Sequence, residues 1–191
     1  MSKFDLSGIP AVFHNGKLVP KIYMNGVLVW ESNAKIIDYV YRSPEYITAD
    51  MEVFIVFENT SDGTYWAVSN NNGTLSAPTA VQLPINNITG GSILVLNAND
   101  LIWVVEYNLG VVKFRKKDSE TEYLYTTNTN NGVRVGEFEN NEFDYADYLQ
   151  HIATGRFLYC YNNQEIRART SNDSYVEQSG RFYVLEISEQ E

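Results

Sequence analysis

Short apolar runs alternate with turn-forming residues along most of the chain. Residues 53–57, 92–96 and 101–107 are rich in β-branched and aromatic side chains, which favour strands. Gly, Asn, Asp and Pro separate such runs at intervals of roughly 8–12 residues, a spacing typical of all-β sandwiches and barrels. The run 53–57 has a continuous apolar character, so it predicts a strand that is covered on both faces.

A tandem repeat lies near the start of the chain. Residues 9–19 and 19–29 share one pattern: aliphatic, Pro, any residue, β-branched aliphatic, aromatic, any residue, Asn-Gly, any residue, Leu-Val. Asn-Gly between apolar runs predicts a two-residue hairpin, because a type I′ turn needs positive φ at both central positions. The repeat therefore predicts two small hairpins that end at Trp30.

Hairpins of this size do not bury enough apolar surface to be stable alone in water. They need a surface to lie on, either the rest of the chain or a neighbouring molecule. We therefore predict a docking segment at residues 1–32 and a β-sandwich domain at residues 33–191. The docking contact is expected from five apolar residues of the hairpins: Phe13, Leu18, Tyr23, Leu28 and Trp30.

One segment has helical spacing instead of strand spacing. In residues 142–154, the apolar residues Tyr145, Leu149 and Ile152 fall on one face at a period close to 3.6. Asn141 is placed to cap the N-terminus of such a helix. The predicted fold class is all-β, with N-terminal tandem β-hairpins followed by a β-sandwich, jelly-roll-like, that carries one short α-helix.

Asn residues occur in clusters, of which Asn70, Asn71 and Asn72 form the longest uninterrupted run. Asn tolerates left-handed backbone and closes turns. The clusters therefore predict loops between strands, and this run is expected to follow a strand at residues 64–68.

Three titratable residues, Asp144, Asp147 and His151, would share the polar face of the predicted helix. They could form a metal site or an acid–base site. The alternative is a solvated helix face, because Asp near a helix N-terminus and His near its C-terminus suit the helix dipole. We favour the solvated face. With no recognisable catalytic motif in the chain, we expect a protein that is not an enzyme, with no catalytic residue, metal or cofactor.

Charge excludes two classes of partner. The net charge of −10 and the isoelectric point near 4.7 argue against nucleic acid and against an anionic membrane surface. No apolar stretch approaches the ~20 residues of a membrane-spanning helix, so we expect no membrane insertion. The first residues lack the apolar core of a signal peptide, which predicts folding in a cytosol or export without a cleaved signal.

Aromatic side chains offer a different kind of site. Tyr65 and Trp66 alternate along a predicted strand, so one of the two is expected to face outward. An outward aromatic ring beside Asn-rich loops could stack on a sugar. The sequence therefore carries a second hypothesis, a carbohydrate-binding module that recognises a host-surface glycan.

The segment from Lys21 to Glu31, with the pattern K-I-Y-x-N-G-x-x-V-W, resembles a hairpin of structural proteins of tailed bacteriophages. These include tail, baseplate, fibre and capsid-accessory (decoration) components. The resemblance covers about the first thirty residues. It implies a non-enzymatic virion subunit that is assembled in the host cytoplasm and attached to other virion proteins by its N-terminal hairpins. By analogy it also implies a homo-oligomer, with a trimer as the first expectation.

Overall fold

The computed structural model describes residues 9–72, 78–108, 111–127, 132–137, 139, 141–145, 149–151, 156–161, 165–169 and 181–189. The elements in these ranges are almost all strands. They are β1 (Val12–His14), β2 (Lys17–Val19), β3 (Lys21–Met24), β4 (Val27–Glu31), β5 (Ala34–Tyr41), η1 (Pro44–Tyr46), β6 (Glu52–Asn59), β7 (Thr64–Asn72), β8 (Pro78–Leu83), β9 (Gly91–Leu96), η2 (Ala98–Asp100), β10 (Trp103–Asn108), β11 (Val111–Lys116), β12 (Tyr123–Thr126), β13 (Val133–Gly136), β14 (Phe143–Tyr145), β15 (Leu149–His151), β16 (Arg156–Tyr161), β17 (Glu165–Arg169) and β18 (Arg181–Glu189). η1 and η2 are single turns of 3-10 helix. Among the described residues, no helix is long and apolar enough to span a membrane.

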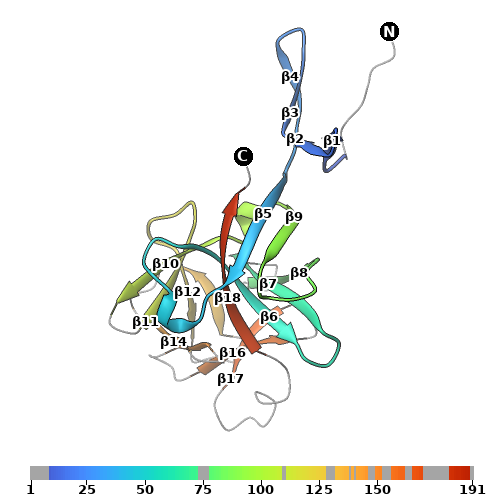
Figure 1. Cartoon of the computed structure of the whole chain (residues 1–191). Helices are drawn as coiled ribbons and strands as arrows, with labels where there is room; N and C mark the ends of the chain where they lie inside the picture. The colour runs from blue at the N-terminus through green and yellow to red at the C-terminus, as the bar shows by residue number, and fades with distance from the viewer. Residues whose placement is uncertain are drawn as a thin grey trace.

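The two predicted hairpins are confirmed as separate two-stranded sheets, β1–β2 and β3–β4. Their turns have the left-handed backbone that Asn-Gly favours, with φ of 51° at Asn15, 77° at Gly16, 50° at Asn25 and 78° at Gly26. Only two residues separate β4 from β5, the first strand of the body. Figure 1 shows both hairpins at one end of the molecule, away from the rest of the strands.

The body is one 14-stranded sheet that closes on itself, and every described strand pairing in it is antiparallel. Pairing runs from β6 through β10, β11, β14, β15, β16, β17, β8 and β7 and returns to β6. β12 and β13 extend from β11, while β18, β5 and β9 extend from β6. The all-β class with N-terminal tandem hairpins is confirmed, and strands pack face to face across a core, as in a sandwich.

Two hydrophobic cores lie on the two faces of β6. Val53, Ile55 and Phe57 point into a core shared by the ring strands, whereas Phe54 and Val56 point into a second core closed by β5, β9 and β18. All five side chains are at most 2% exposed. The continuous apolar run therefore forms the doubly covered strand that its sequence predicts.

The helix predicted at residues 142–154 is wrong. This stretch forms the short antiparallel strands β14 and β15, with Tyr145 paired to Leu149. A spacing of four residues brings two side chains together on a helix, but it does the same across a tight hairpin, where the two residues face each other. Phe143 and Leu149 both enter the ring core at 0% exposure, so tertiary packing decides between the two structures.

The Asn run after residue 68 also differs from its prediction. β7 continues through Asn70 to Asn72, and Asn70 is 1% exposed. Its amide donates to the carbonyl oxygens of Asn99 at 2.6 Å and Ile102 at 2.9 Å. Asn70 therefore ties β7 to the end of η2 through one part-buried and one buried hydrogen bond.

Candidate functional site

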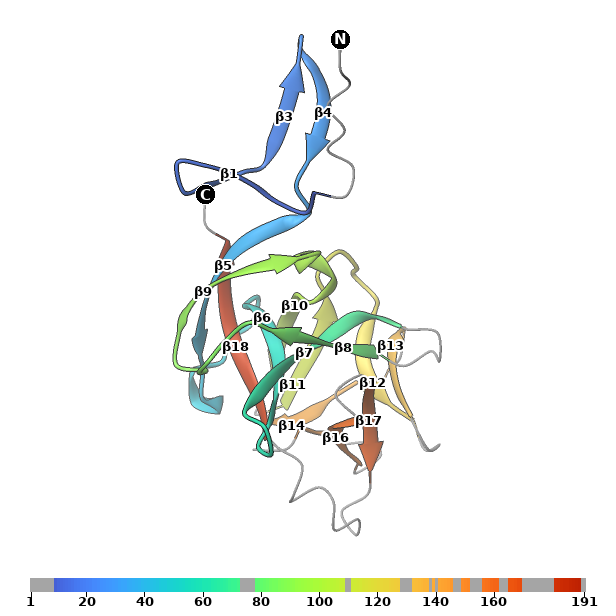
Figure 2. The same cartoon turned by 90° about the vertical axis from the view of Figure 1, so that its right-hand side faces the viewer.

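Within the part of the chain that the structure describes, the most exposed apolar surface lies on residues 9–31, which we call the hairpin module. Figures 1 and 2 show it projecting from one end of the body in both views. Of the twelve large hydrophobic residues with high exposure in the described ranges, seven belong to it, although it is a small part of the chain. They are Ile9 (40%), Phe13 (49%), Tyr23 (59%), Met24 (62%), Val27 (65%), Leu28 (43%) and Val29 (47%).

The two hairpins present equivalent pairs of apolar side chains. Phe13 lies opposite Leu18 in β1–β2, and Tyr23 lies opposite Leu28 in β3–β4, so each aromatic–leucine pair occupies one face of its hairpin. Phe13, Tyr23 and Leu28 are exposed, and Leu18 is half-buried. Four of the five predicted docking residues are therefore at least partly accessible.

Trp30, the fifth predicted docking residue, faces inward. Its side chain is 8% exposed, and its indole N–H donates to the carbonyl oxygen of Ile9 at 3.1 Å. The predicted role of Trp30 as an anchor in a partner needs correction, because the indole already packs within its own chain. It secures the start of the first repeat against the end of the second.

Ser32 joins the two repeats at their base. Its hydroxyl donates to the carbonyl oxygen of Pro10 at 3.0 Å, and its backbone N–H donates to that of Pro20 at 2.9 Å. The same hydroxyl accepts from the backbone N–H of Ala34 at 3.1 Å. Pro10 and Pro20 occupy the same position in the two repeats, but no sequence signal marks Ser32 as their common partner, since the fold alone brings them together.

The base of the module is also tied to the body. Asn33 donates from its side chain to Oδ1 of Asn97 at 3.0 Å, and its carbonyl oxygen accepts from the backbone N–H of Asn97 at 2.8 Å. Lys35 donates to Oδ1 of Asn99 at 3.0 Å and pairs with Glu189 at 2.6 Å. These contacts hold the first residues of β5 against η2, so the direction of the module is set by hydrogen bonds at its base.

The hairpin module and the body differ in net charge as well as in exposed apolar surface. Residues 9–31 contain Lys17, Lys21 and Glu31, for a charge of +1 with His neutral. Residues 1–8 contain one Lys and one Asp and have no net charge. The total of −10 therefore leaves a net charge of −11 on residues 32–191. Lys21 and Glu31 pair across the β3–β4 ribbon at 3.0 Å, with both side chains about half exposed. The module is therefore the apolar and weakly cationic end of an acidic protein.

The aromatic pair predicted to bind a glycan is covered by the body. Tyr65 is 7% exposed and lies in the second core, whereas Trp66 is half-buried against the ring core. The indole N–H of Trp66 donates to Oγ1 of Thr64 at 2.7 Å. Neither ring is fully exposed, because β7, like β6, has a core on each face.

Glu58 gathers the tyrosines at this end of the second core. The Tyr183 hydroxyl donates to its carboxylate at 2.7 Å, and the Tyr65 hydroxyl makes a longer contact at 3.4 Å. Burial, and then the hydrogen bond to Glu58, raise the pKa of Tyr183 to about 12. Burial is also the first cause that raises the pKa of Tyr65. Both hydroxyls therefore stay protonated and serve as structural donors.

Two shallow depressions in the body are lined by ion-paired side chains. One, of about 560 Å³, is lined by Glu106, Arg115, Lys117 and residues 118–120. In it, Glu106 accepts from Arg115 Nε at 3.0 Å and from the Tyr123 hydroxyl at 3.0 Å.

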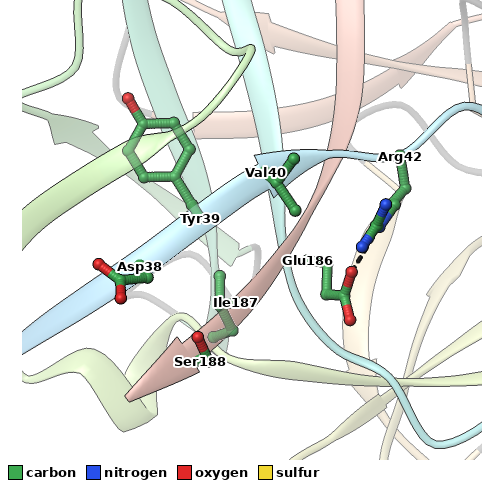
Figure 3. A pocket seen from close by; sticks show the side chains of 7 residues that line it. All are labelled: Asp38, Tyr39, Val40, Arg42, Glu186, Ile187 and Ser188. Carbon is green, nitrogen blue, oxygen red and sulfur yellow. Dashed lines mark hydrogen bonds and ion pairs between the residues drawn. The ribbon is translucent and has the colours of Figure 1, made fainter. Parts of the chain in front are cut away.

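The other, of about 260 Å³, lies over β5 and β18. Figure 3 shows Arg42 and Glu186 paired at one end of it, with Asp38 and Ser188 at the other.

The acidic residues and histidine predicted to share a helix face are not brought together as a cluster. Asp144 pairs with Gln150, and His151 pairs with Phe143, so they occupy neighbouring positions of two strands. Asp147 lies outside the described residues. Across the described parts of the chain, no group of three or more His, Cys, Asp or Glu side chains is placed to hold a metal ion.

No protein-family model matches this chain, and no curated protein matches it. Among solved structures, the chain is similar to the Polyporus squamosus lectin, solved with the epitope Neu5Aca2-6Galb1-4GlcNAc. The sequences are 12% identical, with a TM-score of 0.46. The match covers 71% of this chain and 49% of the lectin chain, so this chain spans about half of the lectin. A likeness at this level carries no argument about function.

Proposed function

We propose that this chain is a non-enzymatic structural subunit of a bacteriophage virion, fastened to the particle by its hairpin module. One observation carries the proposal: a projecting pair of hairpins exposes Phe13, Tyr23 and Leu28 to solvent at 43–59%. Monomeric proteins rarely leave contiguous apolar surface uncovered unless it binds something. The resemblance of residues 21–31 to phage structural hairpins supplies the type of assembly.

The hairpins do not use their own body as the surface they need. Of the side chains in the hairpin module, Trp30 alone is buried, and the ribbons extend away from the body. The partner is therefore a second molecule with an apolar surface. Aromatic anchors such as Tyr23 and Phe13 are favoured in such contacts.

Removal of residues 1–32 tests the attachment. The truncated chain is expected to fold, since both cores lie in the body, and to be absent from purified particles when it is expressed during assembly. The full chain with Tyr23→Ser and Leu28→Ser is the point-variant counterpart. Incorporation of the truncated chain at the level of the full chain would contradict the proposal.

A carbohydrate-binding role is the second candidate. It no longer has Tyr65 or Trp66 as its platform, but the shallow depression beside Glu106 and Arg115 offers carboxylate acceptors and guanidinium donors. A glycan array with the full chain tests it. Binding that Arg115→Ala abolishes and Lys21→Ala preserves would support this site, whereas binding by neither the full chain nor the variants would remove it.

A further inference from the structure

The body carries a second exposed apolar feature at the edge of its sheet. β9 is the last strand of the 14-stranded sheet, and within the described residues it pairs with β5 alone. Its sequence, Gly-Ser-Ile-Leu-Val-Leu, has no charge and no Pro. An open, uncharged edge strand is a template for pairing with another strand, and proteins usually protect such edges.

Two of the exposed side chains of β9 are apolar, and acidic side chains lie on the neighbouring strands β5 and β18. Leu94 and Leu96 are 38% and 47% exposed, and Leu94 lies opposite the half-buried Ile36. Ser92 lies opposite Asp38, whose other neighbour across the sheet is Ser188. The depression of Figure 3 therefore continues the same face, which carries Asp38 and Glu186 against one cation, Arg42. We call Ile36, Asp38, Leu94 and Leu96 the receiving edge.

A molecule's own hairpin module is directed away from its receiving edge. Leu96 pairs with Ala34, directly after the two residues that connect the module to the body. Those two residues, Ser32 and Asn33, are held by hydrogen bonds to Pro10, Pro20 and Asn97. With its base fixed in this way, the ribbon extends from the end of β5 away from the body.

We propose that the β3–β4 ribbon of one copy adds to the receiving edge of a second copy, so that the chain assembles head to tail. This inference rests on the proposed docking role of the hairpin module and names its partner. The two surfaces match in kind: each is a strand with an open edge and exposed apolar side chains, Tyr23 and Leu28 on the ribbon and Leu94 and Leu96 on β9. Strand addition supplies backbone hydrogen bonds, and the side chains supply specificity.

Charge favours a second copy as the occupant. The ribbon, residues 21–31, holds one Lys and one Glu that pair with each other and has no net charge, and β9 has no charged residue, while residues 32–191 as a whole carry −11. Like-charged bodies repel one another, so contact between the neutral ribbon and the uncharged edge strand is the least opposed way to bring two copies together. A head-to-tail contact leaves one free ribbon and one free edge on each dimer, which leads to a closed ring or to a filament.

Complementation between two variants tests the inference. The full chain is expected to sediment above its monomer mass of 21.8 kDa at high concentration. Tyr23→Ser damages the ribbon and Leu94→Lys damages the edge, and each alone is expected to weaken self-association at least about tenfold. An equal mixture of the two variants is expected to form a one-to-one dimer, because each retains the surface that the other lacks. Val81→Lys, at an equally exposed site on β8, is the matched control and is expected to associate like the full chain.

Three results would overturn the inference. They are a full chain that stays monomeric up to its solubility limit, self-association that survives Tyr23→Ser, as expected if β9 paired with β9, and a mixture of the two variants that fails to associate. Circular dichroism of each variant establishes that it is folded. Loss of virion incorporation in Tyr23→Ser with a monomeric full chain would refute self-docking and leave the proposed function standing. Normal incorporation of Tyr23→Ser into virions, together with lost self-association, would refute the proposed function and leave self-docking standing.

Discussion

In the body, neighbouring side chains of one strand enter two different cores, whereas in the hairpin module they enter solvent. Phe54 and Ile55 of β6 are both 0% exposed, while Val27 and Leu28 of β4 are 65% and 43% exposed. The same residue types and the same strand geometry occur in both regions. The difference lies in what surrounds the strand, so the exposed apolar residues of the module are the basis of its proposed docking role.

The largest expected effect is on stability and belongs to the body. Trp103 is 0% exposed in the ring core, and its indole N–H donates to the carbonyl oxygen of Val68 at 3.0 Å. Trp103→Ala is expected to lower the free energy of unfolding by about 3–5 kcal/mol, measured by urea denaturation. Tyr23→Ala in the module is expected to change it by less than about 0.5 kcal/mol. A similar loss in the free energy of unfolding for both variants would contradict the distinction between the body and the hairpin module.

A smaller effect is expected where the body buries a polar group. Asn70→Ala leaves the carbonyl oxygens of Asn99 and Ile102 without their donor, at a cost of about 1–3 kcal/mol in urea denaturation. The neighbouring Asn71 is exposed, so Asn71→Ala is the control and is expected to be close to neutral. A neutral Asn70→Ala would mean that water replaces the amide without loss.

Alkaline pH is expected to weaken the body through its buried tyrosines. The pKa of Tyr183 is about 12 in the folded protein, above the ordinary value of 10.0 that applies to the unfolded chain. The stability that follows from this difference is fully present below pH 10 and is lost as the pH rises through 12. Tyr183→Phe is expected to reduce the loss by on the order of 1 kcal/mol between these limits.

Glu58→Gln sharpens that test, since the carboxylate is the second cause of the raised pKa. Ultraviolet difference titration of this variant is expected to show the pKa of Tyr183 below 12. Tyr107→Phe, at a side chain that is 42% exposed, is the control for the stability measurement. An alkaline stability profile that is the same in Tyr183→Phe and the parent chain would contradict the assignment.

The smallest expected effect is confined to the base of the module. Ser32→Ala removes the hydroxyl that bonds Pro10 and Ala34, and is expected to destabilise the module locally by about 1 kcal/mol. Hydrogen exchange in β3 and β4 should become faster while exchange in β6 stays unchanged. Ser61→Ala, in an exposed turn of the body, is the control. Faster exchange throughout the chain would show that the module and the body are one cooperative unit.

Local sequence patterns were sufficient to predict the two hairpins and the doubly covered strand β6. The Asn15-Gly16 and Asn25-Gly26 turns depend on the backbone freedom of two adjacent residues, which is a property of those residues. The apolar run from Val53 to Phe57 required two covered faces whatever covered them. Both predictions hold because they need no information about distant parts of the chain.

The predicted sites at Tyr65, Trp66 and Trp30 depended on more than local pattern. Alternation on a strand distinguishes two faces, but it does not reveal that both faces of β7 are covered. Likewise, Trp30 ends an exposed ribbon in the sequence, and its burial arises from a hydrogen bond to Ile9, twenty-one residues earlier.

The sequence by itself determined the all-β class, the two turns of the hairpin module and the acidic charge of the remainder, because each follows from composition or from a few adjacent residues. The tertiary structure decided that residues 142–154 contain a strand pair, that the sheet closes at β10 and β6, and that Ser32 unites the two repeats. It also decided which apolar residues stay outside. Those outcomes depend on contacts between residues far apart in the chain, whose cost in chain entropy is recovered only when a shared core forms.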